Sequence, residues 1–80
     1  MPNIFIWNGY RFFFYSNEDV EPPHIHVAKS GCQAKFWLAD CSLAYNDDFK
    51  HNELSKLKVV VAKNRFMFLE AWYEYEKRKY

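Results

Sequence analysis

Two kinds of hydrophobic pattern divide the chain near its middle. Residues 3–45 hold short runs of aromatic and β-branched residues separated by turn residues, which is typical of β-strands. Residues 52–79 contain neither glycine nor proline, and their apolar residues recur three and four positions apart, which is typical of an amphipathic helix. The sequence therefore predicts one α+β domain over residues 1–80, with strands at about 4–45 and a helical region at about 52–78.

Turn residues set the limits of the predicted strands. Asn8-Gly9 separates two apolar runs and is a strong β-hairpin signal, because both central residues of such a turn take positive φ. Ser30-Gly31 is a second candidate hairpin turn. We expect an antiparallel sheet of four to five strands built mainly on these two hairpins. The expected segments are Ile4–Trp7, Tyr10–Tyr15, His24–Lys29 and Cys32–Leu38, then a short edge strand at Ser42–Tyr45 and an acidic loop at Asn46–His51.

The last third of the chain is expected to form one long or broken helix packed on one face of the sheet. Asn52 is an acceptable N-cap, and Glu53 in the first turn suits the helix dipole. A kink near Lys63-Asn64-Arg65 would divide the helix in two. The apolar stripe comprises Leu54, Leu57, Val61, Phe68, Trp72 and Tyr75, widened by Ala62, Phe66, Leu69 and Tyr73. It is expected to cover the sheet face that carries Ile25, Val27, Phe36 and Leu38.

Two histidines follow a double proline in the segment EPPHIHVAKSG. Pro22-Pro23 forces an extended backbone, so His24 and His26 enter the next strand at a fixed point. Successive strand residues point to opposite faces, which places both histidines on the face away from the helix. A turn at Ser30-Gly31 sets Lys35 beside His26 and Trp37 beside His24. Arg11, Phe13 and Tyr15 extend the same surface, although a slip of one residue would reverse every assignment.

Two chemical interpretations of this surface are open. In the first, His24 and His26 bind a metal such as zinc, but a third ligand from His51, Cys32, Cys41, Asp19 or Asp40 does not stand at a diagnostic spacing. In the second, His24, His26 and Lys35 are catalytic residues of a metal-independent ribonuclease. One imidazole takes the 2′-hydroxyl proton, the other protonates the leaving oxygen, and Lys35 stabilises the phosphorane. Arg11, Tyr15 and Trp37 would bind the RNA substrate, and no cofactor is required.

A third interpretation is a non-enzymatic protein-interaction module. The chain holds eight Phe, six Tyr and three Trp, which is 21% of its residues and more than one thin core can bury. Surplus aromatic residues and free sheet edges suit a small partner protein or another copy of the chain. The net charge of +1 attracts no class of partner by itself. Two cysteines outside any C-x-x-C spacing and no long apolar run predict a soluble, cytoplasmic chain with reduced thiols and no membrane contact.

Nearly the whole chain resembles a known family of small bacterial proteins. The stretch GYRFFFYSNEDVEPPHIHVAKSGCQAKFWL, followed by LAY and then NELSKLKVVVAKNRFMFLEAWYEY, is similar to the family known as domain of unknown function 4160. The resemblance implies a compact α+β domain acting as the candidate toxin of a type II toxin–antitoxin pair, in complex with a small antitoxin of the domain of unknown function 2442 type. No chemistry is implied. The matching motif residues are Pro22, Pro23, His24, His26, Lys35, Trp37 and Trp72.

Overall fold

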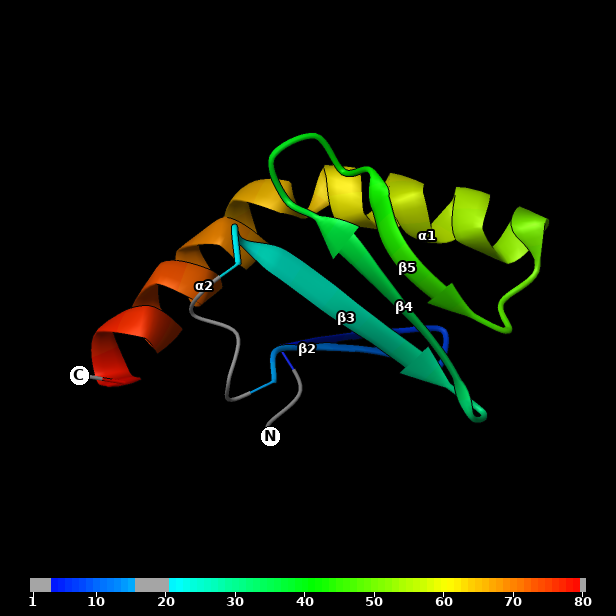
Figure 1. Cartoon of the computed structure of the whole chain (residues 1–80), viewed down its shortest axis with the longest axis horizontal. Coiled ribbons are helices and arrows are strands. Elements are labelled where there is room, and N and C mark those ends of the chain that lie inside the picture. Colours follow the sequence, from blue (N-terminus) through cyan, green and yellow to red (C-terminus); the bar gives the residue numbers. More distant parts are fainter. Residues whose placement is uncertain (1–3, 16–20, 80) are drawn as a thin grey trace.

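The structure is a computed structural model that describes residues 4–15 and 21–79, with side chains described as far as residue 76. Its described part contains a five-stranded antiparallel sheet followed by two helices (Figure 1). The elements are β1 (Phe5–Trp7), β2 (Tyr10–Phe13), β3 (His24–Lys29), β4 (Cys32–Trp37), β5 (Leu43–Asp47), α1 (His51–Lys63) and α2 (Arg65–Lys79). The predicted α+β fold, including the fifth strand and the broken helix, is confirmed.

Both predicted hairpin turns are present. Asn8 and Gly9 have φ of 48° and 82°, and Ser30 and Gly31 have φ of 52° and 83°. These are the left-handed values that a two-residue type I′ turn requires, and glycine adopts them without steric cost. The strands lie in the sheet in sequence order from β1 to β5, each antiparallel to the next. Local turn chemistry therefore determines most of the topology.

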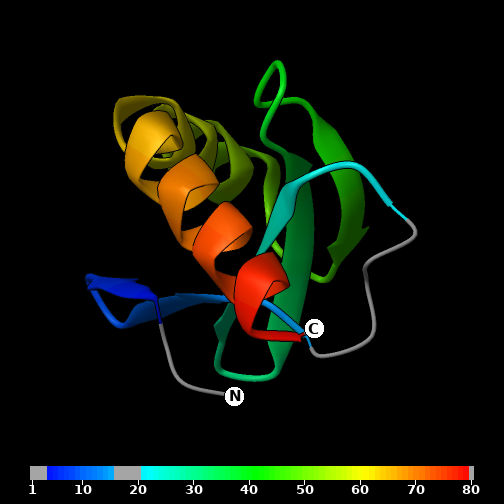
Figure 2. The ribbon, with the colours of Figure 1, turned by 90° about the vertical axis from the view of Figure 1, so that its left-hand side faces the viewer.

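The register between β3 and β4 is the one predicted from the turn. Ile25 pairs with Phe36, and Val27 pairs with Ala34. These four side chains are at most 1% exposed and face the helices. Both helices lie on the same side of the sheet, and α2 runs past the end of the sheet where β3 begins (Figure 2). The helices thus leave the opposite face of the sheet uncovered over most of its area.

The helix breaks at Asn64, as expected, but the hydrogen-bond pattern carries on across the break. The Asn64 N–H donates to the Val60 carbonyl at 3.1 Å, and the Phe68 N–H donates to the Asn64 carbonyl at 2.9 Å. Arg65 anchors the junction to the end of β4, because its guanidinium donates to the carbonyl oxygens of Leu38 and Ala39. The rotation of successive residues about the helix axis is therefore nearly unchanged across the break.

The largest differences between the observed and predicted helix and strand limits concern β5, β2 and the start of α1. Asn46 and Asp47 belong to β5, and β2 ends at Phe13. The first helix begins at His51 with Lys50 as N-cap, so the prediction of Asn52 as N-cap was wrong by two positions. The side chain of Asn46 explains why α1 begins earlier than predicted. It accepts the N–H of Phe49 and donates to the Phe49 carbonyl, both at 3.1 Å, and so closes the loop directly before the helix.

Three residues predicted to widen the buried helical stripe face solvent instead. Phe66 is 77% exposed and Tyr73 is 58% exposed, and Ala62 is exposed as well. Leu69 is partly buried against the core, as expected. Phe66 and Tyr73 are exposed because positions two and five residues from the buried Phe68 point away from it around the helix. Phe68 stacks on Phe12 at 5.6 Å between ring centroids and meets the edge of Phe5 at 6.0 Å.

Glu53 links the start of α1 to β2. Its carboxylate accepts the backbone N–H of Lys50 and the hydroxyl of Tyr10, each at 3.0 Å. The Lys50 bond, followed by the Tyr10 bond, lowers the pKa of the Glu53 carboxyl. Burial, and then the bond to Glu53, raises the pKa of the Tyr10 hydroxyl. The charged form of Glu53 is therefore stabilised in the folded protein.

We predict that Glu53→Gln lowers the free energy of unfolding at neutral pH and flattens its dependence on acid. Because the folded pKa of Glu53 is below the unfolded value, its stabilisation is present above the unfolded pKa and is lost as pH falls through the folded pKa. Urea unfolding at a series of pH values measures this. The gap between wild type and variant should close on acidification, and a gap that stays constant would contradict the assignment.

Candidate functional site

The sheet face that points away from the helices carries all six residues predicted to form a site. We call it the open face. The strand pairings place Arg11 beside Ala28, His26 beside Lys35 and His24 beside Trp37. Tyr15 continues the chain after β2 and reaches across the face to donate from its hydroxyl to Gln33 Oε1 at 3.2 Å. Gln33 also lies on this face, beside Ala28, and Tyr45, which the sequence did not single out, lies beside Lys35 through the pairing of β4 with β5.

His26 lies at the centre of an aromatic cluster on the open face. Phe13 stacks on its ring at a centroid distance of 5.8 Å and an interplanar angle of 22°. Tyr15 meets it edge-on at 4.5 Å, and Tyr15 itself is 40% exposed. The His26 ring is half-buried. The cluster thus presents planar rings and one imidazole at the surface, next to the amine-bearing position Lys35 on β4.

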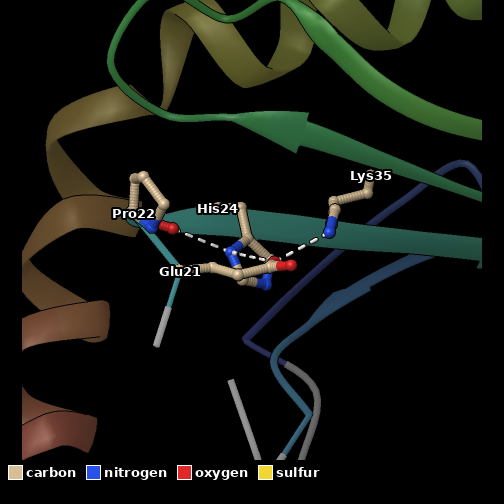
Figure 3. Close-up of polar contacts among 4 residues, drawn as sticks. All are labelled: Glu21, Pro22, His24 and Lys35. Carbon is tan, nitrogen blue, oxygen red and sulfur yellow. Dashed lines mark hydrogen bonds and ion pairs between the residues drawn. The ribbon is translucent and has the colours of Figure 1, made fainter. Parts of the chain in front are cut away.

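His24 shares this face by register but is fully buried. Its Nδ1 lies 2.9 Å from the Pro22 carbonyl oxygen (Figure 3). A carbonyl can only accept, so Nδ1 must carry the hydrogen. Trp72 from α2 lies 5.0 Å from the His24 ring, and Trp37 lies 5.7 Å away. A substrate could not reach this ring, and its Nδ1 proton is already donated to Pro22. This geometry favours a structural role for His24 over the predicted catalytic one.

Glu21 contacts two of the candidate site residues, and the sequence interpretation missed it. Its Oε1 accepts from the Lys35 ammonium at 2.8 Å and lies 3.7 Å from His24 Nδ1. The Lys35 ammonium also lies 5.0 Å from the centroid of the Trp37 ring. Only 16% of the Lys35 side chain is exposed. The carboxylate therefore fixes the mostly buried Lys35 side chain beside Trp37. The place of Glu21 three residues before His24 was the only signal in the sequence.

The open face does not bring all of its predicted residues into one pocket. Arg11 pairs with Ala28, whereas Trp37 pairs with His24. These positions are four residues apart along β3, or about 13 Å at the usual strand rise. Arg11 is exposed, so it lies free for a ligand at the far end of the face. The arrangement is an elongated surface suited to an extended ligand rather than a compact catalytic centre.

The metal interpretation gains no further ligands from the described residues. Within residues 4–15 and 21–79, no three His, Cys, Asp or Glu side chains gather as a metal site would require. Asp19 lies outside the described residues. Both cysteines are free thiols, and Cys41 is buried. Burial, followed by the charge of Asp48, raises the pKa of the Cys32 thiol, which makes it a poor nucleophile or ligand.

No helix in the described part of the chain is both long enough and apolar enough to cross a membrane.

We predict that the two histidines differ in their effect on stability. His24→Ala should lower the free energy of unfolding by about 2–4 kcal/mol, because it removes a buried ring and leaves the Pro22 carbonyl without its donor. His26→Ala, at a half-exposed position, should cost less than about 1.5 kcal/mol. Urea denaturation of both variants measures the difference. Equal effects would show that His24 is not the buried anchor described above.

Comparison with known proteins identifies a family. No curated protein and no solved structure matches the chain. One family model, Domain of unknown function (DUF4160), matches residues 9–73. The match covers β2 to β5, α1 and the first part of α2. It includes His24, Trp37 and Trp72, which meet around the buried imidazole, as well as the whole of the β3–β4 hairpin. Because the match spans most of the sequence, the chain belongs to the DUF4160 family.

Proposed function

We propose that the open face binds single-stranded RNA, and that the chain acts as the toxin component of a type II toxin–antitoxin pair with a small antitoxin of the domain of unknown function 2442 type. One observation carries the RNA proposal. The rings of Phe13, Tyr15 and His26 pack together on the uncovered side of the sheet, and the adjacent strand supplies Lys35. Proteins that bind unpaired nucleotides commonly combine aromatic rings, on which bases stack, with basic side chains that contact phosphates.

The open face offers both elements of single-strand recognition. Unpaired bases stack on aromatic rings, and each stacked base contributes about 1–3 kcal/mol. Tyr15 is 40% exposed and Tyr45 is 54% exposed. Their strands lie on either side of the β3–β4 hairpin, so the two rings can hold separate bases. Arg11 and Lys35 lie on the same face as these rings and can contact the phosphates between them.

Binding is favoured over cleavage by the state of His24. Cleavage through the 2′-hydroxyl needs one group to accept a proton and another to donate one. His26 is half-buried beside Tyr15, and a bound nucleotide can reach it. The His24 imidazole is buried, and its Nδ1 donates to Pro22. The open face thus presents one accessible imidazole, which suits hydrogen bonding or stacking with a base better than paired proton transfer.

The proposal of a protein partner has separate support. Several large apolar side chains other than the rings proposed to hold bases are more than 40% exposed in the single chain. They are Ile6, Leu43, Val59, Phe66 and Tyr73. Surfaces of this kind usually mark contact with another protein. They also favour a second candidate function, a protein-interaction module without RNA binding, in which the open face belongs to the partner contact.

We predict measurable binding of a fluorescently labelled 12-nucleotide oligouridine by fluorescence anisotropy. Tyr15→Ala should weaken it about 5- to 150-fold, the equivalent of one stacked base. Lys35→Gln should weaken it less and reduce the salt dependence. If Arg11 and Lys35 each neutralise one phosphate, the slope of log K against log salt should be about −1.4 for wild type and about −0.7 for the variant.

Lys58→Gln is the matched control for that measurement, because Lys58 is an exposed lysine on α1, on the other side of the sheet. Electrophoresis of the same RNA after incubation reports cleavage. Intact RNA is expected. If the wild type degrades the RNA and a folded His26→Ala variant does not, the open face is a catalytic site and not only a binding site. Binding that Tyr15→Ala and Lys35→Gln leave as unchanged as the control does would contradict the open face as the RNA site.

We predict that induced expression arrests bacterial growth and that co-expression of the neighbouring-gene partner relieves the arrest. A Tyr15→Ala/Lys35→Gln double variant should lose toxicity while it still binds the partner. Growth curves and co-purification measure the two properties. Arrest that survives the double variant would remove the open face from the toxic activity. If the wild type binds the partner but does not arrest growth, the result supports the protein-interaction module instead.

A further inference from the structure

A second row of exposed residues lies on the helices, opposite the buried stripe. Val59, Phe66 and Tyr73 are spaced seven residues apart and are 53%, 77% and 58% exposed. Lys63 and Glu70 lie between them at the same spacing. Positions seven apart stay on one side of a helix, with a drift of only about 20°. We call these five residues the outer stripe.

The outer stripe continues across the helix junction, where α2 turns away from the axis of α1 (Figure 1). The i to i−4 hydrogen bonds on both sides of Asn64 keep α1 and α2 nearly in phase. Val59 and Lys63 belong to α1, whereas Phe66, Glu70 and Tyr73 belong to α2. Both helices lie on the side of the sheet away from the open face (Figure 2). The outer stripe is therefore a surface separate from the proposed RNA site, and neither the core nor that site accounts for its rings.

The sequence of the outer stripe is self-complementary about Phe66. In two antiparallel helices related by a twofold axis at residue 66, each residue faces the position equally far on the other side of the axis. Tyr73 then faces Val59 of the second copy, and Glu70 comes beside Lys63 of the second copy. Lys63 and Glu70 form no ion pair with other residues in the described part of the chain. Both remain available for such a contact.

We propose that the outer stripe binds the outer stripe of a second copy of the chain in an antiparallel, twofold arrangement centred on Phe66. A twofold contact uses the same surface on both subunits, so every favourable pair occurs twice. The antiparallel arrangement makes two Lys63–Glu70 pairs and brings the two Phe66 rings together at the axis. A parallel arrangement would instead place like charges beside each other, which opposes association.

A recess beside the outer stripe fits this arrangement. It lies between β1 and α1, has a volume of about 350 Å³, and is lined by Trp7, Lys56, Val59, Val60, Lys63 and Asn64. The Tyr73 ring of the second copy faces Val59 and therefore comes to the rim of this recess. Aromatic side chains that enter apolar recesses are the usual anchors of protein interfaces. Both Trp7 and Val59 offer apolar surface to that ring.

Sedimentation equilibrium tests the proposal with charge reversal. Lys63→Glu alone puts acidic groups at both charged positions of the stripe, and Glu70→Lys alone puts basic groups at both. Each single variant should dimerise at least about tenfold more weakly than wild type, as should Phe66→Asp. An equimolar mixture of the two charge variants should recover dimerisation, because every contact in the mixed dimer joins opposite charges. The double variant should also recover it.

The control is Lys58→Glu, which makes the same charge change on an exposed lysine of α1 outside the stripe and should leave the dimer unchanged. Circular dichroism confirms that each variant is folded. A chain that remains monomeric at roughly millimolar concentration, the limit of weak specific association, would overturn the proposal. So would a dimer that Phe66→Asp does not weaken, or charge variants that fail to recover on mixing.

Discussion

The packing of His24 at the corner where β3 begins holds the described structure together. The ring is fully buried, Trp72 of α2 lies 5.0 Å away, and Trp37 of β4 lies 5.7 Å away. Its Nδ1 donates to the Pro22 carbonyl, which fixes the segment entering the strand. One imidazole thereby joins the double proline, the sheet and the last helix. The hydrogen bond from Nδ1 offsets part of the cost of burying this polar ring.

This packing also decides which groups reach the open face. The Pro22 bond holds the backbone beside Glu21, whose carboxylate accepts from Lys35. His26, two residues further along β3, packs between Phe13 and Tyr15. Of the H-x-H pair, one ring thus supports the surface and the other forms part of it. The two residues that suggest a catalytic dyad in the sequence are thus divided between the buried interior and the open face.

Local signals predicted most of the fold, and long-range packing decided the remainder. Asn8-Gly9 and Ser30-Gly31 set both hairpins and the β3–β4 register, because turn chemistry acts over a few residues. The burial of His24 depends on Trp72, which the chain brings back from far along the sequence, and no periodicity reports that contact. Phe66 and Tyr73 lie on the side of α2 away from Phe68, and it is Phe68 that packs on the rings of Phe5 and Phe12. Which aromatic residues remain exposed is a property of the assembled core.

The central claim is that the open face, supported by His24, is the surface that binds single-stranded RNA. Two-dimensional NMR of the labelled protein, titrated with a 12-nucleotide oligouridine, tests it most directly. The account predicts chemical-shift changes at Arg11, Tyr15, His26, Lys35 and Tyr45, with little change at Val59, Phe66 and Tyr73. Changes confined to the helices, or no saturable change at any residue, would contradict it.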